Sequence, residues 1–171
     1  IHILRAFERK NWLPTLRRVA FMIDGPLVIY STSAWLSKSI NAELIRINEL
    51  QKQINGTDLL IMGIEKSGAF VNHFEDIDTD KGGVKDKFPP QSALLLDDAY
   101  IKRNIIYSQS EKTYGKDTYF GRKFFYKTKT GYKVVPSIAT FNDYQQDLTM
   151  AHTNQFPRLA DAMNLLDQVT S

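Results

Sequence analysis

The sequence predicts one α/β domain in which helices flank a mixed central sheet. Short apolar runs of strand length alternate with segments of helical periodicity along the chain. One of these runs, residues 58–64, is almost uninterrupted, as in a strand covered on both faces. Further on, β-rich runs flank Lys129-Thr130-Gly131, which is the pattern of an antiparallel hairpin.

Length and composition limit the class of protein. The chain has 171 residues, enough for one domain with a real core, and its 43% hydrophobic and 24% charged residues are ordinary for a globular protein. No apolar run approaches the roughly 18 residues that a membrane helix needs, and no signal peptide is visible. Because the chain has no cysteine, disulfides and thiolate metal sites are excluded. We therefore expect a cytoplasmic protein without a membrane segment.

The first part of the chain predicts a helix and a pair of strands. Residues 1–10 place Ile3, Leu4 and Phe7 on one helical face. After Pro14, residues 19–23 form the first expected strand. Gly25-Pro26 then makes a turn, and residues 27–30 are expected to return as a hairpin partner of that strand.

The clearest helix follows. Residues 31–33 are Ser-Thr-Ser and supply possible N-caps, and Asn55-Gly56 is a suitable C-terminal stop. Between them an apolar stripe recurs at steps of three and four residues: Leu36, Ile40, Leu44, Ile47, Leu50 and Ile54. We expect this stripe to pack on the first strands of the sheet.

The middle of the chain predicts a central strand at residues 58–64, and then a long loop at residues 75–92. A short apolar run at residues 92–96 ends in Asp97-Asp98, and a helix is expected over residues 99–107. Beyond that, the hairpin strands are expected at residues 123–128 and 132–138.

The last part of the chain is polar over residues 139–155, and its pattern predicts no element there. A final helix is expected after Pro157. Its apolar stripe consists of Leu159, Met163, Leu166 and Val169.

Acidic residues follow three of the expected strands: Asp24, Glu65 and Asp98, with Asp97 as an alternative to Asp98. In open α/β sheets, ligands gather outside the strand ends. Divalent cations prefer oxygen ligands, and phosphodiester cleavage by two metals needs carboxylates that hold the ions about 3.5–4 Å apart. The pattern is typical of metal-dependent nucleases of the ribonuclease H type, provided that the carboxylates meet in space.

Each acid also has a structural explanation. Asp24 can simply organise its Gly-Pro turn, and Glu65 can pair with Lys66 at the surface. One residue of Asp97-Asp98 can cap the helix that follows while the other binds metal.

Basic residues are concentrated in residues 1–18 and 112–133, which favours a polyanion as partner. In the second segment the charges alternate with aromatic residues, as in grooves that bind single-stranded nucleic acid. Strand alternation requires that one set of these rings belongs to the core. The residues expected to bind DNA are Lys66, Arg122, Lys123, Tyr126, Lys127 and Lys129.

Other chemistries are disfavoured. The histidines His2, His73 and His152 are scattered without metal-ligand spacing. The chain has neither a glycine-rich phosphate loop nor a serine nucleophile elbow, which argues against nucleotide hydrolysis and serine hydrolase chemistry.

Several motifs, taken in order, resemble bacterial members of the NurA nuclease family over most of the chain, from about Arg17 to the last helix. They are Ala20-Phe21-Met22-Ile23-Asp24-Gly25-Pro26-Leu27, Ala34-Trp35-Leu36, Gly63-Ile64-Glu65-Lys66-Ser67-Gly68, Asp98-Ala99-Tyr100-Ile101 and Tyr119-Phe120-Gly121-Arg122-Lys123-Phe124-Phe125-Tyr126-Lys127.

This resemblance implies a ribonuclease H-like core and manganese-dependent DNA cleavage, with 5′ to 3′ exonuclease and endonuclease activity; magnesium is an alternative metal. It also implies a homodimer that works with the hexameric HerA translocase in DNA end processing, repair or defence. The family's first metal-binding Asp corresponds to Asp24, and its later acids are carried over to Glu65 and to Asp98 or Asp97.

The family also uses a Tyr and a His near its C-terminus, in a stretch that this chain does not contain. We therefore expect one NurA-like domain over residues 1–171, cut at its C-terminus and, since Ile1 is not an initiator methionine, also at its N-terminus. Such a fragment can lack activity on its own.

Two other functions fit the same residues. One is a catalytically silent ribonuclease H-like module that binds DNA or docks to a motor protein, its acids serving turns and caps. The other is an enzyme that acts on a different phosphate substrate.

Overall fold

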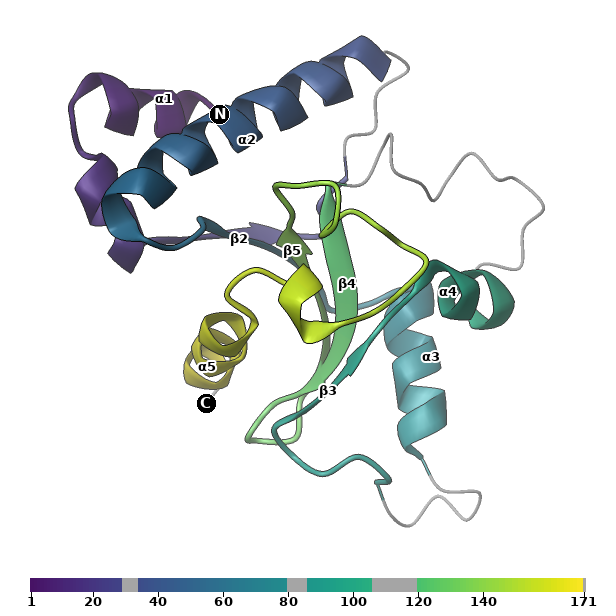
Figure 1. Cartoon of the computed structure of the whole chain (residues 1–171). Coiled ribbons are helices and arrows are strands. Elements are labelled where there is room, and N and C mark those ends of the chain that lie inside the picture. The colour runs from purple at the N-terminus through teal and green to yellow at the C-terminus, as the bar shows by residue number, and fades with distance from the viewer. Residues whose placement is uncertain (29–33, 80–85, 106–119, 171) are drawn as a thin grey trace.

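The sheet has five strands among the residues that the structure, a computed structural model, describes: 1–28, 34–79, 86–105 and 120–170 (Figure 1). In chain order the strands are β1 (Ala20–Asp24), β2 (Leu60–Glu65), β3 (Ser92–Leu95), β4 (Gly121–Lys127) and β5 (Lys133–Ala139). Their order in the sheet is β1-β2-β5-β4-β3. β1 and β2 are parallel, and the other neighbouring pairs are antiparallel. The expected mixed α/β fold is confirmed, and it is consistent with a ribonuclease H-like kind of fold.

Helices cover both faces of this sheet. The α-helices are α1 (His2–Arg9), α2 (Ala34–Asn55), α3 (Ala69–Asp78), α4 (Asp98–Asn104) and α5 (Leu159–Val169), with short 3₁₀ turns η1 (Leu13–Arg18) and η2 (Thr153–Gln155). One face is covered by α1, η1, α2, α3 and α4, and the other face is covered by α5. The side chains of successive strand residues therefore point into different helix layers.

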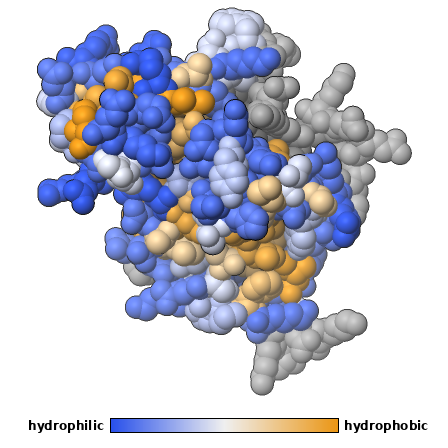
Figure 2. All heavy atoms as spheres, in the orientation of Figure 1, coloured by the Kyte–Doolittle hydropathy of each residue, from blue (hydrophilic) through white to orange (hydrophobic). Residues whose placement is uncertain are grey.

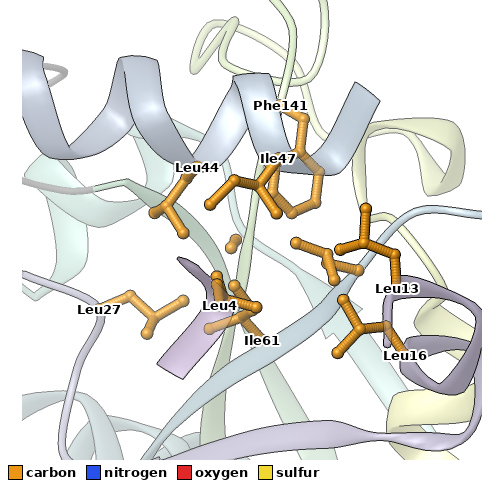
Figure 3. Packing of buried hydrophobic residues seen from close by; sticks show 10 residues of the cluster. Leu4, Leu13, Leu16, Leu27, Leu44, Ile47, Ile61 and Phe141 are labelled. Atoms are coloured by element: carbon orange, nitrogen blue, oxygen red, sulfur yellow. The ribbon is translucent and has the colours of Figure 1, made fainter. Parts of the chain in front are cut away.

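The α2 helix forms where its apolar stripe was expected. Leu44 and Ile47 are buried against Ile61 of β2 and Leu4 of α1 (Figure 3). The helix ends before Gly56, whose positive φ of 70° suits the C-terminal position. The expected packing is confirmed in part: the middle of the stripe, from Ile40 to Leu50, packs in the same cluster as Phe21 of β1, whereas Leu36 and Ile54 are exposed. Ser31 to Ser33, the expected N-caps, lie outside the described residues.

The hairpin of β4 and β5 is also confirmed. Gly131 takes a φ of 88° in the connecting turn, a conformation that favours glycine. Phe124 and Tyr126 pack on the α5 side of the sheet, and Phe125 packs under α3. The strand β4 is buried along its whole length, because helices cover both of its faces.

Two expectations for the secondary structure differ from the structure. The described part of residues 27–30 forms no hairpin with β1, which pairs in parallel with β2 instead; Ile29 and Tyr30 lie outside the described residues. Residues 75–78, expected in a loop, belong to α3. This helix forms because Phe70, Val71 and Phe74 bury one face of it against Phe125, a contact with a distant strand.

The surface seen in Figure 2 is mostly hydrophilic, with apolar residues in small patches between charged ones.

The expected helices after β3 and after Pro157 are confirmed as α4 and α5. The helix α4 was expected to continue to Tyr107, and its expected last residues, Ile106 and Tyr107, lie outside the described residues.

Candidate metal and nucleic-acid site

Asp24 is the last residue of β1 and has the most accessible carboxylate of the expected site. Its side chain is 81% exposed, and the Lys66 ammonium lies 3.3 Å from its Oδ1. It is in register with Ile64, whose side chain packs on the α5 side of the sheet. An exposed carboxylate at a strand end keeps oxygen lone pairs available for a cation.

Glu65 lies at the same end of the sheet, because β1 and β2 are parallel. One residue after Ile64, it belongs to the opposite face, the side of α3. Its side chain is only 17% exposed and is paired with the ammonium of Lys123. Asp24 and Glu65 thus lie at the same end of the sheet, but their side chains leave the backbone on opposite faces.

Lys123 is a buried cation on β4. Its Nζ lies 4.5 Å from the centre of the Phe70 ring, in addition to its ion pair with Glu65. Burial lowers the pKa of Lys123 below its ordinary value, and the charge of Glu65 opposes part of that shift. The pair neutralises Glu65, so a metal that used this carboxylate would have to draw it away from Lys123.

Asp97 and Asp98 follow β3, the edge strand on the opposite side of the sheet from β1, with β2, β5 and β4 between the two edges. These acids are therefore separated from Asp24 across the width of the sheet. Asp97 caps α4 by accepting a hydrogen bond of 2.7 Å from the backbone N–H of Tyr100. Asp98 pairs with Lys102 at 2.9 Å. The structure therefore brings neither residue to Asp24 and Glu65.

The capping alternative is thus confirmed for Asp97. Among the residues that the structure describes, no group of three His, Asp or Glu side chains is placed to hold a metal ion. Of the expected acids, Asp24 and Glu65 share only their position at the ends of neighbouring parallel strands.

The expectation that Arg122, Lys123 and Lys127 face DNA is wrong for this fold, because all three side chains are buried. The guanidinium of Arg122 donates hydrogen bonds to backbone carbonyls of Leu96, Gln145, Asp147 and Met150, and so fixes the polar segment after β5. It also stacks over the ring of Phe156 at 5.2 Å.

Lys127 is held by acids from α3 and the segment before β3. Its Nζ lies 2.9 Å from Oδ2 of the fully buried Asp78 and 2.6 Å from Oδ2 of Asp86, and it also donates to the carbonyl of Phe88. Lys133 of β5 adds a second cation 3.0 Å from Asp78. This ion cluster joins α3 to the hairpin and leaves no free charge on Lys127.

Of the remaining residues expected to bind DNA, Tyr126 is buried in the core, whereas Lys129 and Lys66 are exposed. Burial, followed by interaction with Asp167, raises the pKa of Tyr126 to about 12. Tyr126 therefore serves packing and cannot stack on a base in this structure.

A close backbone crossing lies beside the site and was not expected. After Asp24 the chain passes over Gly63 of β2, where the N–H of Leu27 donates to Oγ of Ser137 at 3.2 Å. A Cβ at Gly63 would lie 2.8 Å from the Leu27 nitrogen and 2.9 Å from that Oγ. A glycine inside a strand is the sequence signal for such a crossing.

Comparisons with known proteins give no match. No protein-family model, no curated protein and no solved structure matches the chain. The NurA resemblance therefore rests on the motifs in the sequence. Within the described ranges, no helix combines the length and apolar character that crossing a lipid bilayer requires.

Proposed function

We propose that the chain is a domain of a divalent-metal-dependent DNA nuclease in which Asp24 is a metal ligand. The observation that supports this most is the exposed carboxylate of Asp24 at the end of β1, where the parallel neighbour β2 also ends in an acid, Glu65. Carboxylates at adjacent strand ends are suited to Mn²⁺ or Mg²⁺, which take oxygen ligands and retain waters for the reaction.

Each residue has a distinct role in this proposal. A bound metal supplies Lewis-acid activation of water and of the phosphate. Asp24 holds the cation, and Lys66, 3.3 Å from Asp24, binds a phosphate oxygen of the DNA. Glu65 is the second acid of the proposal, and it would have to exchange its ion pair with Lys123 for the metal in order to act as a ligand. Because Asp97 and Asp98 lie beside β3, at the opposite edge of the sheet from β1, this proposal leaves them out of the metal site.

The wider setting of this function rests on the NurA resemblance. It comprises 5′ to 3′ exonuclease and endonuclease activity, a homodimer, and work with a HerA-type hexameric ATPase in DNA end processing, repair or defence. A cytoplasmic location belongs to the same proposal.

A second function, a ribonuclease H-like module that binds DNA or docks to a motor protein without cleaving, has its own support. Glu65 is already neutralised by Lys123, Asp97 caps α4, and Asp98 is paired with Lys102. In this alternative Asp24 only terminates β1.

A cleavage assay separates the two functions. End-labelled single-stranded and duplex DNA are incubated with the full-length protein in Mn²⁺ and in EDTA. We expect cleavage in Mn²⁺ that Asp24→Asn abolishes, whereas Asp143→Asn, which removes an exposed charge from the segment after β5, cleaves like the wild type. Equal cleavage by Asp24→Asn contradicts the metal-ligand role. Absence of cleavage by the wild type in Mn²⁺, with DNA binding retained, favours the silent module.

A further inference from the structure

Two depressions follow one another along β1 on the α5 side of the sheet. The first, of about 260 Å³, lies at the start of β1 and is lined by residues that include Arg17, Arg18, Ala20, Arg158 and Asn164. The second, of about 750 Å³, lies toward the end of β1 and is lined by residues that include Met22, Ile64, Lys66, Tyr132 and Val169. Ala20 and Met22 are neighbours on one face of the same strand. We call the two depressions together the β1–α5 groove.

Positive charge marks the first end of this groove. Arg17 and Arg18 are exposed, and neither guanidinium has a hydrogen bond or ion pair with another residue in the described part of the chain. Arg158 pairs with Asp161 at 2.8 Å, so the charge of that acid is already balanced. Two uncompensated guanidinium groups beside an open depression are suited to phosphate oxygens.

The floor of the groove is apolar between the two arginines at its first end and Lys66 at its second end. Met22 is 41% exposed, and Tyr132 is 64% exposed at the other end. A duplex stacks its bases inside and offers mainly phosphates to a surface of this size, whereas a single strand also offers base faces for contact with apolar and aromatic side chains. Cations combined with an apolar, aromatic floor therefore favour a single strand.

We propose that the β1–α5 groove binds a single nucleic-acid strand, with phosphates on Arg17 and Arg18 and a base on Tyr132. From Ala20 to Asp24 the strand β1 advances about 13 Å at about 3.3 Å per residue. A nucleic-acid strand in the groove therefore runs from the arginines toward the Asp24–Lys66 end. The binding itself needs no metal; only its role in cleavage rests on the proposed nuclease function.

Fluorescence anisotropy in EDTA tests the charged end, with a labelled oligothymidine and a labelled hairpin duplex as probes. The salt slope is the fall in the logarithm of the binding constant per tenfold rise in salt concentration. For single strands each phosphate contact contributes about 0.7 to this slope, so each contact strengthens binding about fivefold when salt falls from 1 M to 0.1 M. Arg17→Ala/Arg18→Ala is therefore expected to bind oligothymidine about 25-fold more weakly, with a salt slope lower by about 1.4. The matched control, Lys38→Ala/Arg103→Ala, removes two exposed cations from α2 and α4 and is expected to bind like the wild type.

Tyr132→Ala tests the strand preference. Loss of one base–aromatic stack is expected to weaken oligothymidine binding about fivefold or more and to leave duplex binding unchanged. Wild-type affinity in the double arginine variant overturns the proposal, as does equal weakening of both probes by Tyr132→Ala. Displacement of oligothymidine by polyglutamate at equal charge concentration assigns the groove to acidic peptides instead. Because these assays contain EDTA, a protein that binds but never cleaves contradicts the nuclease function and leaves the groove assignment standing.

Discussion

Replacing the buried Asp78 by Asn is expected to destabilise the fold strongly at neutral pH. Asp78 accepts hydrogen bonds from Lys127 at 2.9 Å and from the backbone N–H of Phe88 at 2.7 Å, and it pairs with Lys133 at 3.0 Å. The change leaves Lys127 buried with the exposed Asp86 as its remaining acidic partner. Removing one partner of a buried ion pair costs about 3–5 kcal/mol, and we expect about 3 kcal/mol because Asp86 stays.

The pH dependence of this loss follows from the pKa of Asp78. Burial raises the pKa of this carboxyl, but hydrogen bonds from Lys127, Phe88 and Lys133 outweigh that effect and lower it from 3.8 to about 2. A lowered folded-state pKa stabilises the wild type above pH 4, the unfolded value, and that stability is lost as the pH falls from 4 toward 2. The difference between 3.8 and about 2 is worth about 2 kcal/mol.

Urea unfolding followed by circular dichroism at pH 7 and at pH 3 measures both effects. The gap between wild type and Asp78→Asn is expected to be about 3 kcal/mol at pH 7 and to shrink in the acidic range. Asp76→Asn, which removes an exposed charge from the same helix, is the matched control and is expected to change stability by less than about 0.5 kcal/mol. A gap below about 1 kcal/mol that does not vary with pH would refute the role assigned to the ion cluster.

Two further substitutions test local features. Gly63→Ala is expected to destabilise the protein by about 3 kcal/mol, because the added Cβ meets the backbone of Leu27 and neither chain segment can move freely. A melting temperature within about 1 °C of the wild type would contradict the close approach of the two backbones. Asp97→Ala is expected to lower the free energy of unfolding by about 1 kcal/mol, because the hydrogen bond to the Tyr100 N–H is lost. Asp98→Ala, which removes a surface ion pair with Lys102, is expected to lower it by less than half as much. A larger effect for Asp98→Ala in urea unfolding would contradict the capping assignment.

Local patterns predicted much of the fold. The stripe of α2, the apolar run of β2 and the glycine turn between β4 and β5 each depend on nearby residues, and each is found in the structure. The α3 helix was not predicted because its stability comes from packing of Phe74 on Phe125, a residue of a distant strand. The strand pairing of β1 likewise depends on a long-range choice of partner.

The basic segment shows why the candidate site was predicted only in part. Lysines in a β-rich segment indicate exposure, but Lys127 is buried because Asp78, far away in sequence, neutralises it. Similarly, Glu65 follows a strand as expected, yet its neutralisation by Lys123 depends on the order of strands in the sheet. The order of the strands also removed Asp98 from the site, because it places β3 at the opposite edge of the sheet from β1.

The most direct test of the proposed function is the cleavage of end-labelled single-stranded DNA in Mn²⁺ by the full-length wild type and by the full-length Asp24→Asn variant, with binding measured in parallel. We expect the wild type to cleave and Asp24→Asn to bind normally without cleaving, because only the metal ligand is lost. Cleavage by Asp24→Asn at the wild-type rate would contradict the assignment of the exposed carboxylate at the end of β1 as a metal ligand.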